Sequence, residues 1–147
     1  DLIAYKPGTN ELLALEVKSY LDSFGVHQRD LLVEHPTCKG VRFKDFTVKA
    51  YRDLVIRRLH EQLIEQGFVA NDAEMPRLGL AVGKWASDSE APIRDRFKEM
   101  GWELIGPEDI CHSLEAMANE GYSNDEAVMV AKMLLRQETK MKPLRKS

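Results

Sequence analysis

Two short apolar runs at the start of the chain are separated by turn-forming residues, and this arrangement predicts a β-hairpin. The runs cover residues 1–6 and 11–18, and the turn at 7–10 reads Pro-Gly-Thr-Asn. Such residues between apolar runs are typical of a hairpin loop. With that loop, Lys6 pairs with Glu11, and the numbers of all paired residues sum to 17.

This register predicts a cluster of charged side chains at the far end of the hairpin. Asp1 falls opposite Glu16, and opposed residues of an antiparallel pair point to the same face. Side chains alternate along a strand, so Glu16 and Lys18 share that face while Val17 points to the other. Residues 12–15 are apolar on both faces, which is typical of a covered central strand. The alternative is a strand end whose charges simply face water.

The pattern of Asp1 followed by Glu16-Val17-Lys18 on the next strand resembles the catalytic motif of the PD-(D/E)xK nuclease superfamily. That resemblance implies a restriction-endonuclease-like core, matched here from its second strand onward and lacking the helix and first strand that precede it. It also implies that Asp1, Glu16 and Lys18 are catalytic. Asp1 and Glu16, with the carbonyl of Val17, would be the ligands of Mg²⁺ or Mn²⁺.

The chemistry of phosphodiester hydrolysis agrees with this set of residues. The reaction places extra negative charge on phosphoryl oxygens, which a divalent ion stabilises. Mg²⁺ prefers oxygen ligands and is typically held by one or two carboxylates plus the substrate. Lys18 would orient or deprotonate the attacking water, or stabilise the developing charge.

Polar residues that follow the hairpin give weaker signals. Gln28 is a possible auxiliary residue, because some members of the superfamily place a glutamine after the acid-x-Lys strand; a polar surface residue is the alternative. His27 and His35 have no partner at metal-ligand spacing, and we expect them at the surface. Cys38 and Cys111 lack a CxxC or Cys/His spacing, which favours reduced thiols over a disulfide or a zinc site.

The rest of the chain alternates between helical and strand patterns. Residues 46–66 are expected to form a helix, with Asp45 as its N-cap and Gly67 at its end. Its apolar stripe comprises Tyr51, Leu54, Val55, Leu59 and Leu63, with Ile64 as a further candidate; Lys49, Arg52 and His60 are expected on the opposite face. Further strands are expected at 76–85 and 102–105, and helices at 90–100, 107–119 and 123–136; residues 27–33 fit a short helix or a strand. This order favours an α/β fold with a mixed central sheet flanked by helices and extra C-terminal helices.

The net charge of −3 conceals a polarised sequence. Residues 39–58 hold seven basic and two acidic residues, whereas residues 103–126 hold seven acidic residues and no Lys or Arg. A basic patch near the hairpin would attract phosphate backbones, although such a run is often only a solvated face. The candidate nucleic-acid-binding residues are Arg42, Lys44, Lys49 and Arg52.

Length and composition suit one domain at 1–139 followed by a basic, disordered tail at 140–147, and we expect this chain to be the C-terminal part of a longer protein. Without a signal-peptide pattern or a long apolar run, we expect a cytoplasmic protein with no membrane partner. The sequence therefore predicts a metal-dependent nuclease, with DNA favoured over RNA as the substrate and a homodimer or larger assembly as one option for its oligomeric state. An inactive nuclease-fold binding or scaffold protein, and an unrelated α/β interaction module docking through its acidic helices, are the alternatives.

Overall fold

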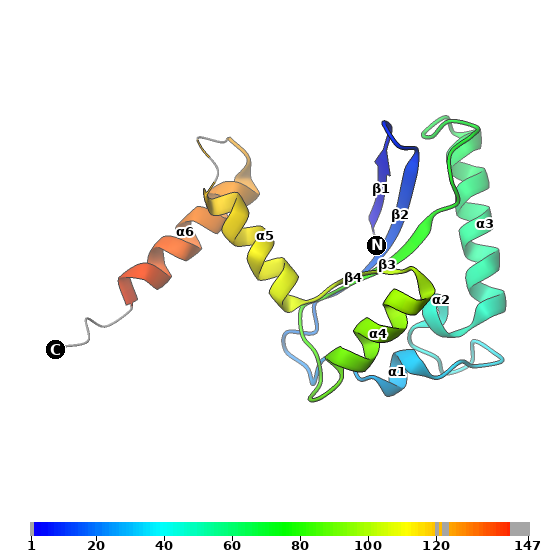
Figure 1. Cartoon of the computed structure of the whole chain (residues 1–147), viewed down its shortest axis with the longest axis horizontal. Coiled ribbons are helices and arrows are strands. Elements are labelled where there is room, and N and C mark those ends of the chain that lie inside the picture. Colours follow the sequence, from blue (N-terminus) through cyan, green and yellow to red (C-terminus); the bar gives the residue numbers. More distant parts are fainter. Residues whose placement is uncertain (1, 120, 122–123, 142–147) are drawn as a thin grey trace. The chain divides into compact units, whose positions relative to one another are not determined.

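The computed structural model describes residues 2–119, 121 and 124–141, with the backbone alone described for 136–141. The chain divides into two compact units, Asp1–Gly106 and Pro107–Ser147, where the sequence suggested one domain at 1–139. Figure 1 shows the elements of both units. Within the described ranges, no helix is long and apolar enough to cross a membrane.

The N-terminal hairpin forms as predicted. Strands β1 (Leu2–Lys6) and β2 (Glu11–Lys18) pair antiparallel in the expected register, from Leu2 opposite Leu15 to Lys6 opposite Glu11. The turn is closed by a 3.2 Å hydrogen bond from the Thr9 amide to the Lys6 carbonyl. Asp1, the predicted partner of Glu16, lies outside the described residues.

Two further strands extend the hairpin into a four-stranded mixed sheet of order β1-β2-β3-β4. Strand β3 (Arg77–Val82) lies parallel to β2, and β4 (Glu103–Ile105) lies parallel to β3. Parallel neighbours need crossover connections, and here helices supply them. The predicted α/β class with a mixed sheet is confirmed.

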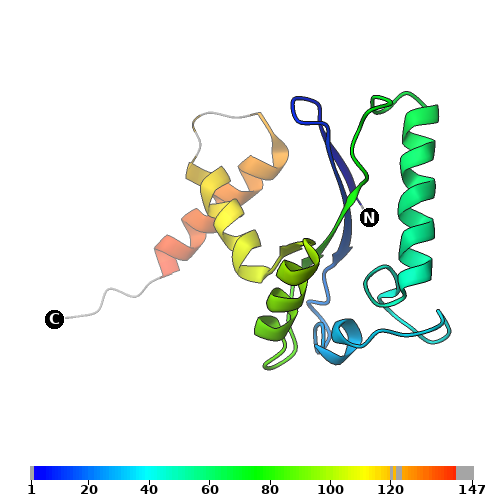
Figure 2. The same ribbon diagram turned by 45° about the vertical axis from the view of Figure 1, so that its right-hand side comes forward.

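Four helices belong to the first unit: α1 (Arg29–Leu32), α2 (Lys44–Thr47), α3 (Lys49–Glu65) and α4 (Glu90–Met100). Figure 2 shows α3 running alongside the sheet. The helix expected at 46–66 is instead two helices, because Val48 adopts an extended conformation between them. Val48 thus occupies the N-cap position of α3, and the prediction that Asp45 caps this helix is wrong.

The main core covers one face of β3. Leu78, Leu80 and Val82 lie on that face, and residues from α1, α2 and α4 pack against them. At its centre Phe46, Phe97 and Trp102 form an aromatic trio with ring centroids 5.1–5.4 Å apart. Tilted and edge-to-face arrangements at this spacing are favourable for aromatic rings. The small residues Gly79 and Ala81 alternate with these large ones along the strand, and the strand predicted at 76–85 is confirmed at 77–82.

The second unit comprises α5 (Pro107–Asn119) and α6 (Glu126–Met141). The Oδ1 atom of Asp125 accepts hydrogen bonds from the amides of Ala127 and Val128, and so caps α6. Ser123, the first residue of the helix expected at 123–136, lies outside the described residues. Helix α6 continues to Met141, so residues 140 and 141, which we expected in the tail, are helical; residues 142–147 are not described.

Candidate active site

Glu16 and Lys18 form an ion pair near the carboxyl end of β2. Both belong to the set of alternate residues that faces the core helices, and the Lys18 Nζ lies 2.8 Å from the Glu16 Oε1. The side chain of Glu16 is 15 % exposed and that of Lys18 is 32 % exposed. Val17 points to the other face, where it is exposed. The predicted sharing of a face by the two charged residues is confirmed.

The second carboxylate oxygen of Glu16 is buried and accepts no hydrogen bond from the described part of the chain. Buried polar atoms are nearly always satisfied, and a buried carboxylate oxygen without a partner is costly. A buried carboxylate oxygen without a hydrogen-bond partner is a feature of ligand-binding sites, and it is also found in ion pairs that only stabilise the fold. The Oε2 atom of Glu16 is therefore the atom of this site with free capacity to bind a cation.

Glu16 lines a cavity of about 220 Å³ between the hairpin and α3, which we call the Glu16 cavity. Its walls are largely apolar, contributed by β1, β2, β3 and α3. Asp45, from the first turn of α2, is the second carboxylate on its lining. No local sequence pattern indicates this proximity, because residues 16 and 45 are brought together only by the crossover from β2 to β3.

The fit of a divalent ion to these residues is partial. Glu16 offers a free oxygen, and Asp45 offers a second carboxylate in the same cavity. Among the described residues, no three His, Cys, Asp or Glu side chains are grouped so as to hold a metal ion. Asp1, the third predicted acid, is outside the described residues. The Asp1 and Val17 ligands and the metal itself therefore stay predictions.

The loop after Lys18 is tied to the end of β3 by close backbone contacts. The Gly83 amide donates a 3.0 Å hydrogen bond to the Lys18 carbonyl, and Val26 pairs with Lys84 and Ala86 beyond the strand end. A Cβ on Gly83 would lie 2.4 Å from the Ser19 carbonyl oxygen, so only glycine permits this approach. These contacts fix the backbone at the end of the strand that carries the ion pair.

Gln28 lies just before α1, where it is exposed. Its predicted auxiliary role stays a prediction. His27 and His35, expected at the surface, are half-buried.

The basic residues predicted to bind nucleic acid divide into two groups. Arg42 and Lys49 are exposed, and Lys44 is half-buried with its Nζ 5.8 Å from the centre of the Tyr51 ring. Lys49 also forms a 2.5 Å ion pair with Asp53. These three side chains lie at the protein surface, accessible to a phosphate backbone.

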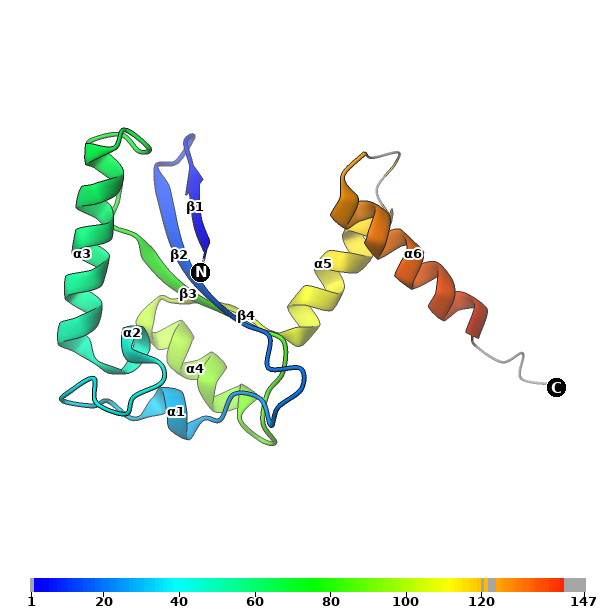
Figure 3. The same cartoon turned by 180° about the vertical axis from the view of Figure 1, so that it is seen from behind.

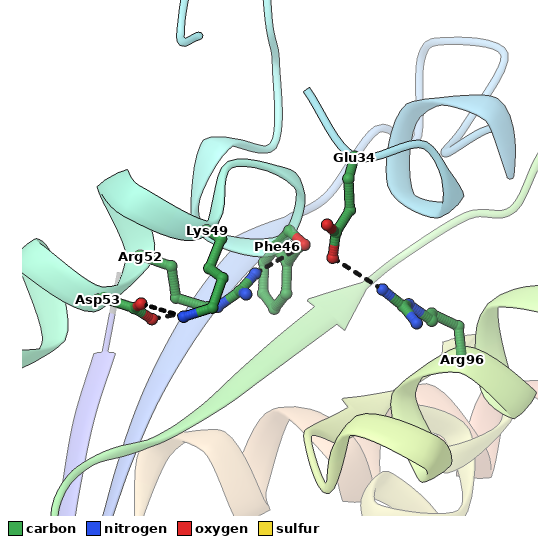
Figure 4. A network of polar contacts seen from close by, with 6 residues as sticks. All are labelled: Glu34, Phe46, Lys49, Arg52, Asp53 and Arg96. Atoms are coloured by element: carbon green, nitrogen blue, oxygen red, sulfur yellow. Dashed lines mark hydrogen bonds and ion pairs between the residues drawn. The ribbon is translucent and has the colours of Figure 1, made fainter. Parts of the chain in front are cut away.

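Arg52 belongs to the interior. It is 9 % exposed, its Nη1 donates a 3.1 Å hydrogen bond to the Phe46 carbonyl, and its guanidinium lies 5.1 Å from the centre of the Trp102 ring. Figure 4 shows the bond to Phe46 beside the Lys49–Asp53 pair. The prediction that Arg52 and His60 lie on the solvent face is wrong, because the inward face of α3 is displaced from the expected stripe. His60 lies within 2.9 Å of the Ala73 carbonyl oxygen, on the same inward side.

Together these features define an α/β protein whose mixed sheet carries a partly buried Glu–Lys pair beside a cavity. Comparisons with protein-family models, curated proteins and solved structures found no match to the chain.

Proposed function

We propose that this protein is a metal-dependent nuclease that hydrolyses phosphodiester bonds, with DNA as the favoured substrate. The observation that carries the proposal is the Glu16–Lys18 pair, in which one carboxylate oxygen contacts the ammonium and the other is buried without a hydrogen-bond partner from the described residues. The arrangement of β1, β2, a helical crossover and a parallel β3 is compatible with the nuclease core that the sequence resembles.

Glu16 and Asp1 would hold the metal ion, and Asp45 is the additional candidate ligand because it lines the Glu16 cavity. When bound, Mg²⁺ or Mn²⁺ would stabilise negative charge on the phosphoryl oxygens. The part played by Lys18 follows from its position. Its ammonium, held beside Glu16, would orient the attacking water or stabilise the charge that develops on the phosphate.

Substrate positioning is assigned to Arg42, Lys44 and Lys49. Contacts with phosphates position a nucleic acid without reading its sequence. Arg52 is left out of this group, because its guanidinium is committed to Phe46 and Trp102.

The test is cleavage of supercoiled plasmid, single-stranded DNA and single-stranded RNA with Mg²⁺ or Mn²⁺. The variants are Glu16→Ala, Lys18→Ala and Asp45→Asn. Glu11→Ala is the matched control, because Glu11 is an exposed carboxylate at the opposite end of β2, paired with Lys6. We expect the first two variants to abolish cutting, Asp45→Asn to raise the Mg²⁺ concentration needed for it, and Glu11→Ala to cut like the parent. A Lys18→Ala protein as active as the parent would refute the mechanism.

A second candidate function is favoured by the surface of the second unit. Large apolar side chains on α6 are exposed, namely Met129, Val130, Met133 and Leu134. Contiguous exposed apolar side chains often mark an interaction site. A protein that acts only as a docking module would show no cutting and no Mg²⁺- or Mn²⁺-induced rise in melting temperature that depends on Glu16.

A further inference from the structure

A second cavity, separate from that of Glu16, lies between α1 and the loop that follows it. Its volume is about 320 Å³, and we call it the α1 cavity. Its charged lining consists of Arg29, Lys39 and Arg42 with a single carboxylate, Asp30; His35 also lines it. Three fixed cations against one anion give the cavity a net positive charge of two. A concave surface with this charge favours an anionic ligand.

Asp30 orients the two arginines but leaves most of their donors free. Its Oδ1 lies 3.9 Å from the Arg29 Nε, and its Oδ2 lies 3.9 Å from the Arg42 Nη1. Charge-assisted hydrogen bonds are about 2.7–2.9 Å long, so neither contact is a full hydrogen bond. Each guanidinium has five N–H donors in a planar fork, which matches the oxygens of a phosphate. The guanidinium groups of Arg29 and Arg42 thus both lie near Asp30 on the cavity lining and keep donors free for another ligand.

The α1 cavity borders the segment that leaves the candidate active site. The Arg42 guanidinium lies 5.6 Å from the centre of the Tyr20 ring, and Tyr20 is two residues beyond Lys18. Figure 3 shows the chain leaving β2 at its carboxyl end and turning into α1. Ligands of α/β sheets bind outside the carboxyl ends of the parallel strands, which is the side of the sheet where this cavity lies.

We propose that the α1 cavity binds one phosphate group of a nucleic-acid strand through Arg29, Arg42 and Lys39. The inference rests on the proposed function, because it takes nucleic acid as the ligand. The phosphate can be a terminal monoester or an internal diester of the backbone, since both present oxygens to the same donors. In either case the cavity would hold the strand at a fixed distance from Glu16 and Lys18.

The test is binding of fluorescent single-stranded DNA, measured by anisotropy in EDTA so that cutting plays no part. Three probes are used: a 12-nucleotide strand with a 5′-phosphate, the same strand with a 5′-hydroxyl, and inorganic phosphate as competitor. The variants are Arg29→Ala and Arg42→Ala. Arg58→Ala is the matched control, because Arg58 is an exposed arginine on α3 that does not line the cavity. The side chains of Arg29 and Arg42 are 78 % and 61 % exposed, so both variants should fold, which thermal melting checks.

We expect each cavity variant to weaken binding about tenfold, as the loss of a charge-assisted contact predicts. Each should also lower the slope of log affinity against log salt by about 0.7, the value for one phosphate contact on a single strand. Arg58→Ala should leave both readouts close to those of the parent. A terminal phosphate is identified if the parent prefers the 5′-phosphate strand and inorganic phosphate competes for binding. An internal phosphate is identified if the cavity variants lose the same binding affinity for both strands.

Cavity variants that bind both strands like the parent, or no more weakly than Arg58→Ala, would overturn the proposal. Its failure is distinguishable from failure of the proposed function, because binding is measured in EDTA and does not require cutting. A protein that binds through the cavity but never cuts retains this inference and loses the nuclease assignment. A protein that cuts without any contribution from Arg29 or Arg42 retains the nuclease assignment and loses this inference.

Discussion

The Nζ of Lys18 contacts one oxygen of Glu16 at 2.8 Å, while the other oxygen of Glu16 is buried and accepts no hydrogen bond from the described residues. Buried carboxylate oxygens are usually satisfied, since each unmet buried acceptor costs free energy. The asymmetry supports the proposal that Glu16 is held in place by Lys18 while its second oxygen binds a cation.

Replacing Glu16 by Gln separates the functional from the structural interpretation by the sign of its effect on stability. Gln keeps the shape of the side chain and removes a buried charge whose second oxygen is unsatisfied, while the ammonium of the partly exposed Lys18 can turn to water, so we expect the free energy of unfolding to rise by about 1 kcal/mol. Urea denaturation measures this change, and Glu11→Gln serves as the exposed control on the same strand. A fall in stability for Glu16→Gln would indicate that the ion pair with Lys18 is a structural contact.

Arg52 is expected to matter for stability and not for nucleic-acid binding. Replacing it by Met keeps much of the apolar stem but removes the donor to the Phe46 carbonyl and the cation over Trp102. We expect the free energy of unfolding to fall by about 2–3 kcal/mol. Arg58→Met, an exposed change on the same helix, should shift it by less than about 0.5 kcal/mol. A stable Arg52→Met protein with weakened DNA binding would return Arg52 to the candidate interface.

The positions of Arg52 and Asp45 show where sequence reasoning reaches its limit. The register of the hairpin was predictable because a turn and the alternation of side chains are local properties. Arg52 was placed on the wrong face because a helical wheel treats a charge as solvent-facing, whereas here the guanidinium lies over an aromatic ring and donates to the backbone. Asp45 was missed because only tertiary structure brings it to the cavity that Glu16 lines.

The interruption of a helix is likewise not predictable from the local periodicity of the sequence. The stretch 46–66 has the periodicity of one helix, yet Val48 is extended and divides α2 from α3. The division buries Phe43, Phe46 and Val48 together. The stabilisation from this burial comes from contacts with distant elements. The periodicity of a single segment carries no information about such contacts.

Asp53 is expected to titrate below the usual range of an aspartate. The hydrogen bond from Lys49, with the charges of Lys49, Arg52 and Arg57, lowers the pKa of Asp53. Because the folded pKa lies below the unfolded one, ionised Asp53 favours folding at pH values above the unfolded pKa. That contribution is lost as the pH falls through the folded pKa. A carboxyl-carbon NMR titration measures it: Lys49→Ala should move the pKa upward, whereas Lys98→Ala, on α4, should leave it in place. An unchanged titration in Lys49→Ala would contradict the assigned cause.

Gly83 provides a test of how tightly the end of β2 must be held. A Cβ at this position would meet the backbone oxygen of Ser19 at 2.4 Å, and backbone atoms next to a paired strand yield only at a cost. We therefore expect Gly83→Ala to lower the free energy of unfolding by about 1–3 kcal/mol, the usual cost of overpacking. The forced displacement falls one residue beyond Lys18, so nuclease activity should fall by more than the lost stability explains. Gly8→Ala is the matched control, because a Cβ at Gly8 meets nothing within 4 Å. Equal stability and activity for the two variants would mean that the loop after Lys18 moves freely enough to accept the methyl group, and that the position of Lys18 does not depend on the contact.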